Sequence, residues 1–421
     1  MTREDREFLT RLFDAAVTAA DPMAALSGVL PDPPTGRTVV VGAGKGAAQM
    51  GAAFEALWDG PLEGVLVTRY GYATACRYLD VLEAAHPVPD AAGLAASEAL
   101  ISAVSGLGPD DLVVALVCGG GSALLPAPPA GLTLQDEADL NAALLASGAP
   151  ISAMNSIRKQ VSRIKGGRLA AAARPARVVS LVVSDVPGDD PAQVASGPTV
   201  PDGQGRAQAL AHVRAYRIDL PQQVKRYLEE APEDAPRPED PAFTRDSVRV
   251  VASASISLEA AAKAAEAEGI PAVILSDAFE GEAREVGKVH AALAREIVLR
   301  NRPFRRPVVV LSGGETTVTL SGPDGRGGRN SEFLLSMALA MDGISGVAAM
   351  AADTDGIDGS EDNAGAFADG GTAARLRDMG QDPAALLMGH DAWTAFDALG
   401  DLFVPGPTGT NVNDFRAFLI R

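Results

Sequence analysis

The stretch RTVVVGAGKGAAQMGAAFEALW, residues 37–58, decides the fold class of this chain. Its opening run of β-branched residues predicts a buried strand over Arg37–Val41. A glycine-rich turn follows, and the alanine-rich segment Ala47–Trp58 predicts a helix. A buried strand that turns through glycines into a helix is typical of α/β proteins with parallel sheets.

The same alternation of short apolar strands and alanine-rich helices recurs along the chain. The other predicted strands are Gly64–Thr68, Leu112–Val117, Arg177–Val183, Val248–Ala252, Ala272–Leu275, Pro307–Leu311, Val347–Ala352 and Phe415–Ile420. Two further helices are predicted over Leu258–Glu268 and Glu282–Leu299. We therefore expect an α/β fold of two α/β domains, each with a largely parallel, Rossmann-like sheet.

One stretch interrupts this alternation. Residues 229–246, EEAPEDAPRPEDPAFTRD, are dense in proline and acidic side chains and show no apolar period. Such a composition predicts a linker or a long surface loop. We place an N-terminal α/β domain at residues 1–235 and a C-terminal α/β domain at residues 246–421.

The composition limits the partners that the protein can have. Its 421 residues carry 36 Lys and Arg against 54 Asp and Glu, a net charge of −18. A surface of that sign repels nucleic acids and anionic membranes, so we expect neither as a partner. Apolar runs of membrane-spanning length and an apolar signal core are missing from the sequence, which predicts a cytoplasmic protein.

The loops after the predicted strands carry the candidate chemistry, because ligands of open α/β sheets bind beyond the carboxyl ends of the strands. Gly42, Gly44 and Lys45 lie between a strand and a helix, where backbone N–H groups and the helix end can hold an anion. The same residues with Ala47 fit the dinucleotide pattern G-x-G-x-x-A, and a solvated lysine at a helix start is a third possibility.

A second glycine loop follows the strand Leu112–Val117. Gly119, Gly120 and Gly121 would let a ligand approach the backbone, and Ser122 follows them directly. A plain tight turn is the alternative.

The main basic cluster of this acidic chain is NSIRKQVSRIKGGR, residues 155–168. Arg158 and Lys165 could share one helical face with Ser162. They either face a ligand or belong to a solvated helix surface.

Carboxylates stand at two further strand ends. Asp185 and Asp189 follow Arg177–Val183, and the loop DTDGIDG, with Asp355, follows Val347–Ala352. Such carboxylates can bind Mg²⁺ or accept the proton of a hydroxyl group.

The last candidates come from the C-terminal half of the chain. Glu315 follows the strand Pro307–Leu311, and Arg329 leaves a glycine-rich turn at a helix start, where it could clamp a phosphate with two N–H donors. Asn411 and Asn413 lie in the last polar loop. The common placement of all these loops at strand ends predicts a shared ligand site.

Together these segments resemble the MOFRL-type glycerate 2-kinases, also called class II glycerate kinases. The resemblance runs nearly from end to end and rests on nine ordered motifs: VGAGKGAAQM from Val41, HPVPD from His86, CGGGSALL from Cys118, NSIRKQVSRIKGGRLA from Asn155, SDVPGDDPAQVASGPTVPD from Ser184, SGGETTV from Ser312, GGRNSE from Gly327, DTDGIDG from Asp353 and GPTGTNVND from Gly406.

The resemblance implies phosphorylation of D-glycerate by ATP with Mg²⁺, giving 2-phospho-D-glycerate, and an active site in a cleft between the two domains. It implies catalytic roles for Lys45, Asp185 and Arg329. Substrate or nucleotide contacts would come from His86, Glu315 and an asparagine of Asn411 and Asn413, and metal contacts from Asp189 and Asp355. We expect a monomer or a homodimer with D-glycerate and ATP as its small-molecule partners.

Two rival functions remain at this point. A hydroxypyruvate reductase would bind NAD(P)H through Gly42, Gly44 and Ala47, but the next strand ends in Thr68-Arg69-Tyr70 and lacks the acid that usually holds a ribose. A non-enzymatic sugar- or nucleotide-sensing module is the other, and the acidic charge argues against a DNA-binding regulator.

Overall fold

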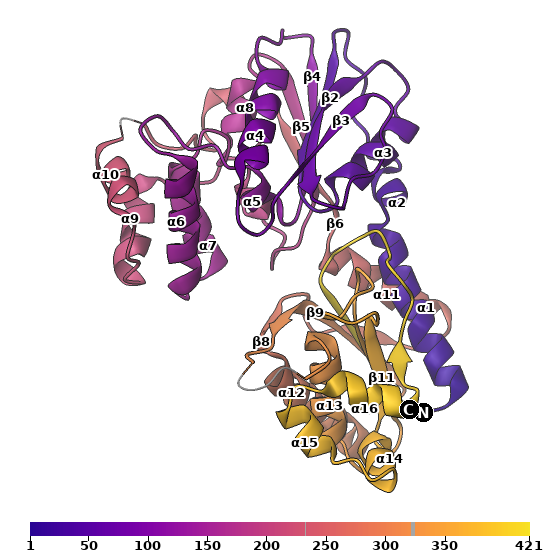
Figure 1. The fold of residues 1–421 in the computed structure, drawn as a ribbon. Coiled ribbons are helices and arrows are strands. Elements are labelled where there is room, and N and C mark those ends of the chain that lie inside the picture. Colours follow the sequence, from indigo (N-terminus) through magenta and orange to yellow (C-terminus); the bar gives the residue numbers. More distant parts are fainter. Residues whose placement is uncertain (232, 321–324) are drawn as a thin grey trace. The chain divides into compact units, whose positions relative to one another are not determined.

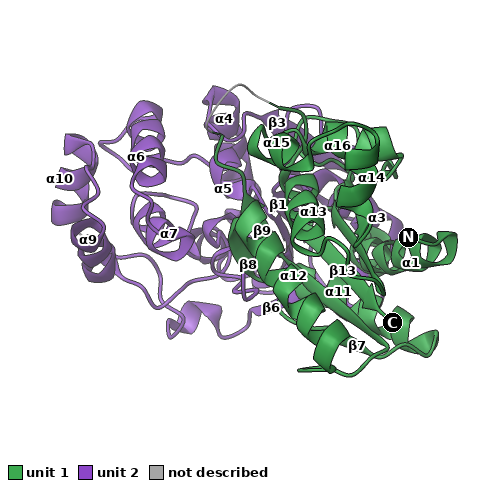
Figure 2. Ribbon diagram, turned by 90° about the horizontal axis from the view of Figure 1, so that it is seen from below, with its two compact units in different colours: residues 1–24, 252–421 green, residues 25–251 purple. Residues whose placement is uncertain are grey.

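The computed structural model describes residues 1–231, 233–320 and 325–421. They form two compact units, coloured separately in Figure 2. Residues 25–251 make the unit that we call the N-terminal unit. Residues 1–24 together with 252–421 make the C-terminal unit. The predicted cleft between the domains stays a prediction.

The N-terminal unit is built on a six-stranded sheet (Figure 1). Its strands, in sheet order, are β3 (Leu79–Ala84), β2 (Glu63–Arg69), β1 (Thr38–Ala43), β4 (Leu112–Cys118), β5 (Arg177–Val183) and β6 (Ser247–Ala252). The first five of these run parallel. The order 3-2-1-4-5-6 is that of the Rossmann fold, so the predicted Rossmann-like sheet is confirmed here.

Apolar clusters stabilise this unit. One of them joins the sheet to its helices. All residues of β1 and β4 are buried because helices cover both faces of the sheet. Another cluster is formed within the helices α6, α7, α9 and α10. The helices of the unit are α3 (Ala47–Leu57), α4 (Ala91–Val104), α5 (Gly121–Leu124), α6 (Leu134–Ala146), α7 (Ile151–Gln160), α8 (Arg168–Ala172), α9 (Arg206–Ala215) and α10 (Gln222–Glu230), with short 3₁₀ turns at Val194–Ser196 and Pro241–Phe243. The short helix α2 (Pro22–Leu26) contains the boundary between residues 24 and 25.

The acidic, proline-rich stretch 229–246 does not end the first sheet. After it, β6 pairs beside β5, so the predicted strand Val248–Ala252 exists but belongs to the N-terminal unit. The stretch is therefore a surface loop that returns the chain to its own sheet; Pro232 lies outside the described residues. The boundary between the units falls at residues 251–252 instead of 235–246.

The C-terminal unit is built on a second, mixed sheet. Its strands, in sheet order, are β12 (Leu402–Phe403), β11 (Gly365–Asp369), β10 (Val347–Asp353), β13 (Asp414–Ile420), β9 (Val308–Thr317) and β7 (Ala272–Ile274), while β8 (Phe279–Glu282) pairs with β9. Only β7 and β8 run parallel to β9 within the described residues, and the other pairs are antiparallel. The α/β class is confirmed, but the expectation of largely parallel strands is wrong for this sheet, because the closing strand β13 inserts antiparallel between β9 and β10.

Helices cover both faces of the second sheet, each over its own apolar cluster. They are α1 (Arg3–Ala20), α11 (Ala254–Ala267), α12 (Ala283–Arg300), α13 (Arg329–Ala340), α14 (Thr372–Asp378), α15 (Pro383–Met388) and α16 (Ala392–Leu399). Helix α1 precedes the first sheet in sequence, yet it packs here. It buries Phe8, Leu12 and Phe13 in the cluster that also contains Leu258 of α11 and Phe415 of β13. This apolar stripe explains why residues 1–24 leave the domain in which the sequence analysis placed them.

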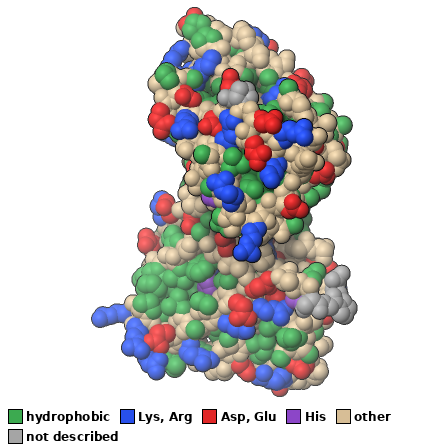
Figure 3. Space-filling view, turned by 90° about the vertical axis from the view of Figure 1, so that its left-hand side faces the viewer, with side chains coloured by type: hydrophobic (Ala, Val, Ile, Leu, Met, Phe, Trp, Pro, Cys, Tyr) green, Lys and Arg blue, Asp and Glu red, His purple; other side chains and the backbone are tan. Residues whose placement is uncertain are grey.

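The charges of the surface are mixed in sign. On the face in Figure 3, Lys and Arg side chains lie among Asp and Glu side chains, so the net charge of −18 is not spread as a uniform acidic coat there. Among the described helices, none combines the length and the apolar character that crossing a membrane would require.

Candidate functional site

The carboxyl edge of the first sheet gathers the candidates of the N-terminal unit. Lys45 follows β1, His86 follows β3, Gly119 follows β4 and Asp185 follows β5. Because these strands are parallel, their carboxyl ends meet at one edge, as the sequence analysis predicted.

The three consecutive glycines make room for functional side chains. A Cβ atom on Gly119 would lie 2.1 Å from Oδ2 of Asp185. One on Gly120, whose φ is +74°, would lie 3.0 Å from Cγ of Lys45 and 3.3 Å from Nε2 of His86. Any larger residue at these positions would therefore displace the aspartate, the lysine or the histidine. The glycines let a cation, an imidazole and a carboxylate converge on one loop.

Backbone bonds hold this convergence in place. The N–H of Lys45 donates to the carbonyl oxygen of Gly119 at 2.9 Å, and the hydroxyl of Thr68 donates to the carbonyl oxygen of Lys45 at 3.1 Å. Burial lowers the pKa of His86 to about 4, with further lowering by the positive charges of Lys45 and Arg69. His86 is therefore a neutral imidazole at physiological pH, placed beside a charged lysine.

Gly42 and Gly44 are explained by strand packing. A Cβ atom on Gly42 would lie 2.5 Å from the carbonyl oxygen of Leu116, and one on Gly44 would lie 2.3 Å from that of Cys118. Both positions are filled by the backbone of β4. The glycines allow β1 and its turn to approach β4, and their predicted role in nucleotide binding stays a prediction.

Ser122 starts a chain of polar contacts that reaches the basic cluster. Its hydroxyl lies 2.7 Å from that of Ser196, which donates to Oδ1 of Asn155 at 3.0 Å. Nη1 of Arg158 donates to the same Oδ1 at 3.1 Å, and Nε of Arg158 donates to Asn141 at 2.8 Å. Burial lowers the pKa of Arg158 to about 10, although Glu137 opposes the shift. Arg158 thus contacts the loop of Ser122 indirectly, through Asn155 and Ser196.

Lys165 and Asp189 do not join this group. Nζ of Lys165 is buried and donates to Oε1 of Glu137 at 2.6 Å and to the carbonyl oxygen of Leu125 at 2.9 Å, so its charge is paired inside the protein. The expected helical face of Arg158, Ser162 and Lys165 is wrong, because α7 ends at Gln160. Asp189 lies in a turn with a φ of +55°, and its metal role stays a prediction.

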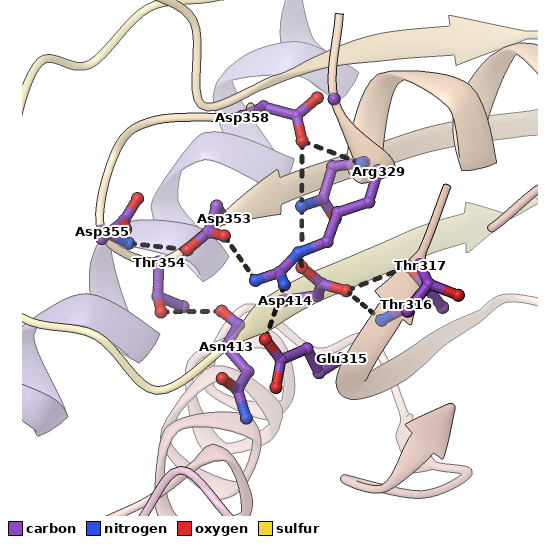
Figure 4. A network of polar contacts seen from close by, with 12 residues as sticks. Glu315, Thr316, Thr317, Arg329, Asp353, Thr354, Asp355, Asp358, Asn413 and Asp414 are labelled. Atoms are coloured by element: carbon purple, nitrogen blue, oxygen red, sulfur yellow. Dashed lines mark hydrogen bonds and ion pairs between the residues drawn. The ribbon is translucent and has the colours of Figure 1, made fainter. Parts of the chain in front are cut away.

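The C-terminal unit has its own cluster, at the edge where β9 and β10 end and β13 begins (Figure 4). Arg329, the first residue of α13, lies at its centre. Its Nε donates to Oδ1 of Asp414 at 2.7 Å, its Nη1 to Oε1 of Glu315 at 2.9 Å, and its Nη2 to Oδ2 of Asp353 at 2.7 Å. Burial lowers the pKa of Arg329, but the three carboxylates outweigh it and raise the pKa above its ordinary value.

The sheet register brings these carboxylates together. Asp414 of β13 pairs with Asp353 of β10 on one side and with Gly314, next to Glu315 of β9, on the other. Burial raises the pKa of Asp353 well above its ordinary value; Arg329 opposes this shift, while neighbouring carboxylates add to it. Arg329 is therefore held among carboxylates and is not a free anion clamp, although two of its five N–H groups are not used by these three bonds.

The glycine turn before Arg329 lets the loop 353–359 pack closely against the start of α13. A Cβ atom on Gly328 would lie 2.4 Å from the backbone and the carboxylate of Asp358. That carboxylate accepts the N–H groups of Asn330 and Ser331 at 2.9 and 2.8 Å and thereby caps α13. Burial raises the pKa of Asp358. The turn fixes the helix start from which Arg329 projects.

The asparagine loop lies against the same cluster. Nδ2 of Asn411 lies 3.4 Å from Oδ2 of Asp355, and the N–H of Asn413 donates to Oδ1 of Asn411 at 3.1 Å. The carbonyl oxygen of Asn413 accepts the N–H and the hydroxyl of Thr354. Glu315, Arg329, Asp355, Asn411 and Asn413 thus lie in one region of the C-terminal unit, and their roles in ligand binding stay predictions.

The sequence analysis missed Asp414 and Arg416 as site residues. Asp414 accepts Arg329, and Arg416 donates to Asp414 from the buried interior of β13. A signal existed: in DFRAFLI, the residues 414, 416, 418 and 420 share one face of the strand, and two charged residues on an otherwise apolar face are unusual.

The fold and these two clusters define an α/β enzyme with polar groups at the carboxyl edge of a Rossmann-ordered sheet. Residues 308–414 match the MOFRL family, and residues 8–229 match a family described as "Domain of unknown function (DUF4147)". The chain is 38% identical over 408 residues to D-glycerate 2-kinase of Thermotoga maritima, covering 96% of each chain. It is 54% identical over 417 residues to an Agrobacterium vitis protein provisionally named hydroxypyruvate reductase, covering 99% of this chain and 94% of that one.

A solved structure agrees with the sequence comparison. The crystal structure of a glycerate kinase from Thermotoga maritima superposes with a TM-score of 0.91 at 35% identity, covering 100% of both chains. The protein belongs to the MOFRL-type glycerate 2-kinase family.

Proposed function

We propose that the protein transfers the terminal phosphoryl group of ATP to the 2-hydroxyl of D-glycerate, giving 2-phospho-D-glycerate and ADP. The observation that carries the proposal is the whole-chain likeness, in sequence and in fold, to the glycerate kinase of Thermotoga maritima. In the same proposal the enzyme works in the cytoplasm, as a monomer or a homodimer.

The edge of the first sheet supplies what phosphoryl transfer requires. Such a reaction needs positioning, positive charge near the phosphates and a group that accepts the hydroxyl proton, with little covalent chemistry by the protein. Lys45 provides the positive charge and Asp185 the proton acceptor, on either side of the Gly119–Gly120 loop. His86 is neutral beside Lys45, so it can hydrogen-bond a ligand without adding charge.

The cluster of the C-terminal unit contributes a fixed guanidinium. The three carboxylates around Arg329 raise its pKa and favour its charged form, and its two further N–H groups can hold an oxygen of the transferred group or the carboxylate of D-glycerate. Glu315, whose side chain is 54% exposed, is the carboxylate of the three that a ligand can displace most easily.

Magnesium would enter with ATP. In the parts of the chain that the structure describes, no three His, Cys, Asp or Glu side chains are arranged as a metal cage. Mg²⁺ on a nucleotide needs only one or two carboxylates, and Asp355 fits: its Oδ1 accepts the N–H of Ile357 and its Oδ2 lies beside Asn411, while a carboxylate has about four acceptor positions. Asp355 would hold the ion, which neutralises charge on the phosphates, and a metal role for Asp189 stays a prediction.

Parallel assays test the proposal against the reductase alternative. Purified protein is incubated with D-glycerate and ATP–Mg²⁺, or with hydroxypyruvate and NADH. We expect ADP release that depends on D-glycerate, no oxidation of NADH, and loss of ADP release in Lys45→Ala. NADH oxidation without ADP release would replace the proposal by the reductase, and neither signal would favour a binding module.

A further inference from the structure

The cluster around Arg329 has a second arginine behind it. Arg416 lies in the middle of β13, between Ser312 of β9 and Ala351 of β10 in the sheet register. Its side chain is 0% exposed. Residues alternate between faces along a strand, so Arg416 shares its face with Asp414, Phe418 and Ile420. Its guanidinium carbon lies 4.8 Å from the ring centroid of Phe333 on α13.

A charge in this position is costly for the fold. Nη2 of Arg416 donates to Oδ2 of Asp414 and to the hydroxyl of Thr316 at 3.1 Å. Nε and Nη1 have no hydrogen-bond partner among residues 1–231, 233–320 and 325–421. Buried donors without partners destabilise a protein, and apolar residues of similar volume often replace buried ion pairs without loss of stability. Stability alone therefore does not explain an arginine at this position.

Its one charged partner connects Arg416 to Arg329. Asp414 receives Arg416 and both donors of Thr316 on Oδ2, and it receives Arg329 at 2.7 Å and Asn330 at 2.8 Å on Oδ1. The two guanidiniums thus hold opposite oxygens of one carboxylate, which is itself 2% exposed. A shift of the Asp414 carboxylate would turn the plane of the Arg329 guanidinium, because Arg329 donates to Asp414 through Nε.

We propose that Arg416 is a positioning residue for the phosphoryl transfer: it fixes Asp414, and Asp414 orients Arg329. The inference rests on the proposed function for its kinetic consequence, but its structural consequence does not. Without Arg416, the carboxylate of Asp414 would keep its bonds to Thr316, Asn330 and Arg329 but lose the donor that anchors it from the interior of the sheet.

The test compares Arg416→Met with Arg416→Lys and with Arg375→Met. Met keeps the length and apolar packing, and Lys restores a positive charge. Arg375→Met removes an arginine that donates to Asp401 at 2.8 Å. Arg375 belongs to α14, which follows β11 at the end of the sheet opposite to the Arg329 cluster. We expect kcat to fall about 10-fold to 100-fold in Arg416→Met, the scale of a misplacement of about 1 Å. Its melting temperature should fall, because removing one partner of a buried ion pair is destabilising, so kcat is measured well below the unfolding transition of the variant. Arg416→Lys should recover part of kcat, and Arg375→Met should keep kcat.

A second readout does not depend on activity. The Nε–H resonance of Arg329 in NMR spectra, identified by its absence in Arg329→Lys, should shift in Arg416→Met and stay in place in Arg375→Met. Wild-type kcat in Arg416→Met, or an unmoved Arg329 resonance, would overturn the inference. A wild-type protein without kinase activity would instead refute the proposed function, and the resonance would then decide the positioning alone.

Discussion

Replacing Arg329 by lysine probes the centre of the C-terminal cluster. The guanidinium makes three bonds of 2.7–2.9 Å to three carboxylates, and lysine keeps the charge but loses the planar fork. Its single ammonium can replace one of the two bonds to the buried Asp353 and Asp414.

The magnitude follows from the burial of the partners. A bond to a buried charged group contributes about 1.5–3 kcal/mol, and the bond to the exposed Glu315 contributes about 0–1 kcal/mol. Losing one buried bond and the exposed one should destabilise the C-terminal unit by about 1.5–4 kcal/mol. For a unit of this size that corresponds to a fall in melting temperature of about 3–16 °C.

Calorimetry and kinetics measure the two consequences of Arg329→Lys separately. Arg326→Lys is the matched control: it lies in the same loop, but its side chain is 53% exposed and it pairs with Glu361, so its melting temperature should change little. A fall in kcat/KM for both substrates would place Arg329 on the transferred phosphoryl group, and a higher KM for D-glycerate alone would place it on the carboxylate. A wild-type melting temperature together with kinetics within about twofold of wild type would refute the reasoning.

Three substitutions and one titration test further residues. Lys45→Ala should abolish turnover with the fold intact, and a folded variant with wild-type kcat would remove Lys45 from the mechanism. Asp185→Asn should lower kcat by roughly 10²-fold, the scale of general base catalysis. A variant that keeps kcat at saturating Mg²⁺ but has a lower affinity for Mg²⁺ would make Asp185 a metal ligand instead. Asp353→Asn should be more stable than wild type at pH 8, and this difference in stability should shrink as the pH falls. The pKa of Asp353 is raised, so wild type gains stability when this carboxyl takes up a proton. Thermal unfolding at several pH values measures the difference, and a difference that grows toward low pH would contradict the prediction. His86 should stay neutral in NMR titrations from pH 8 to about pH 5, since its pKa is about 4. Lys45→Ala should raise this pKa, but to a value below 6.5, because burial lowers it more than the charge of Lys45 does. Titration of His86 near pH 6.5 in wild type would contradict both statements.

Local elements were predictable from the sequence because their signals are local. The strand, turn and helix of residues 37–58 appear as β1, Gly44–Gly46 and α3, and the predicted closing strand appears as β13. Strand ends at one edge of a parallel sheet must meet, so the sequence alone is enough to place Lys45 and Asp185 at the same edge.

Features that depend on pairing between distant segments were not predictable. Nothing in the residues 247–252 says which sheet they join, and the partners of α1 lie more than 200 residues away. The same holds for Arg329, whose carboxylates come from three strands, so its charge was visible in the sequence but its surroundings were not.

The product of the reaction tests the central claim most directly. Phosphorus NMR of purified protein with D-glycerate, ATP and Mg²⁺ distinguishes the two possible esters, because a phosphate on carbon 2 is coupled to one proton and a phosphate on carbon 3 to two. We predict a new phosphomonoester doublet that grows as ATP is consumed and is absent with Lys45→Ala. A triplet would move the transfer to carbon 3, and the absence of any new phosphomonoester would contradict the assignment as a glycerate 2-kinase.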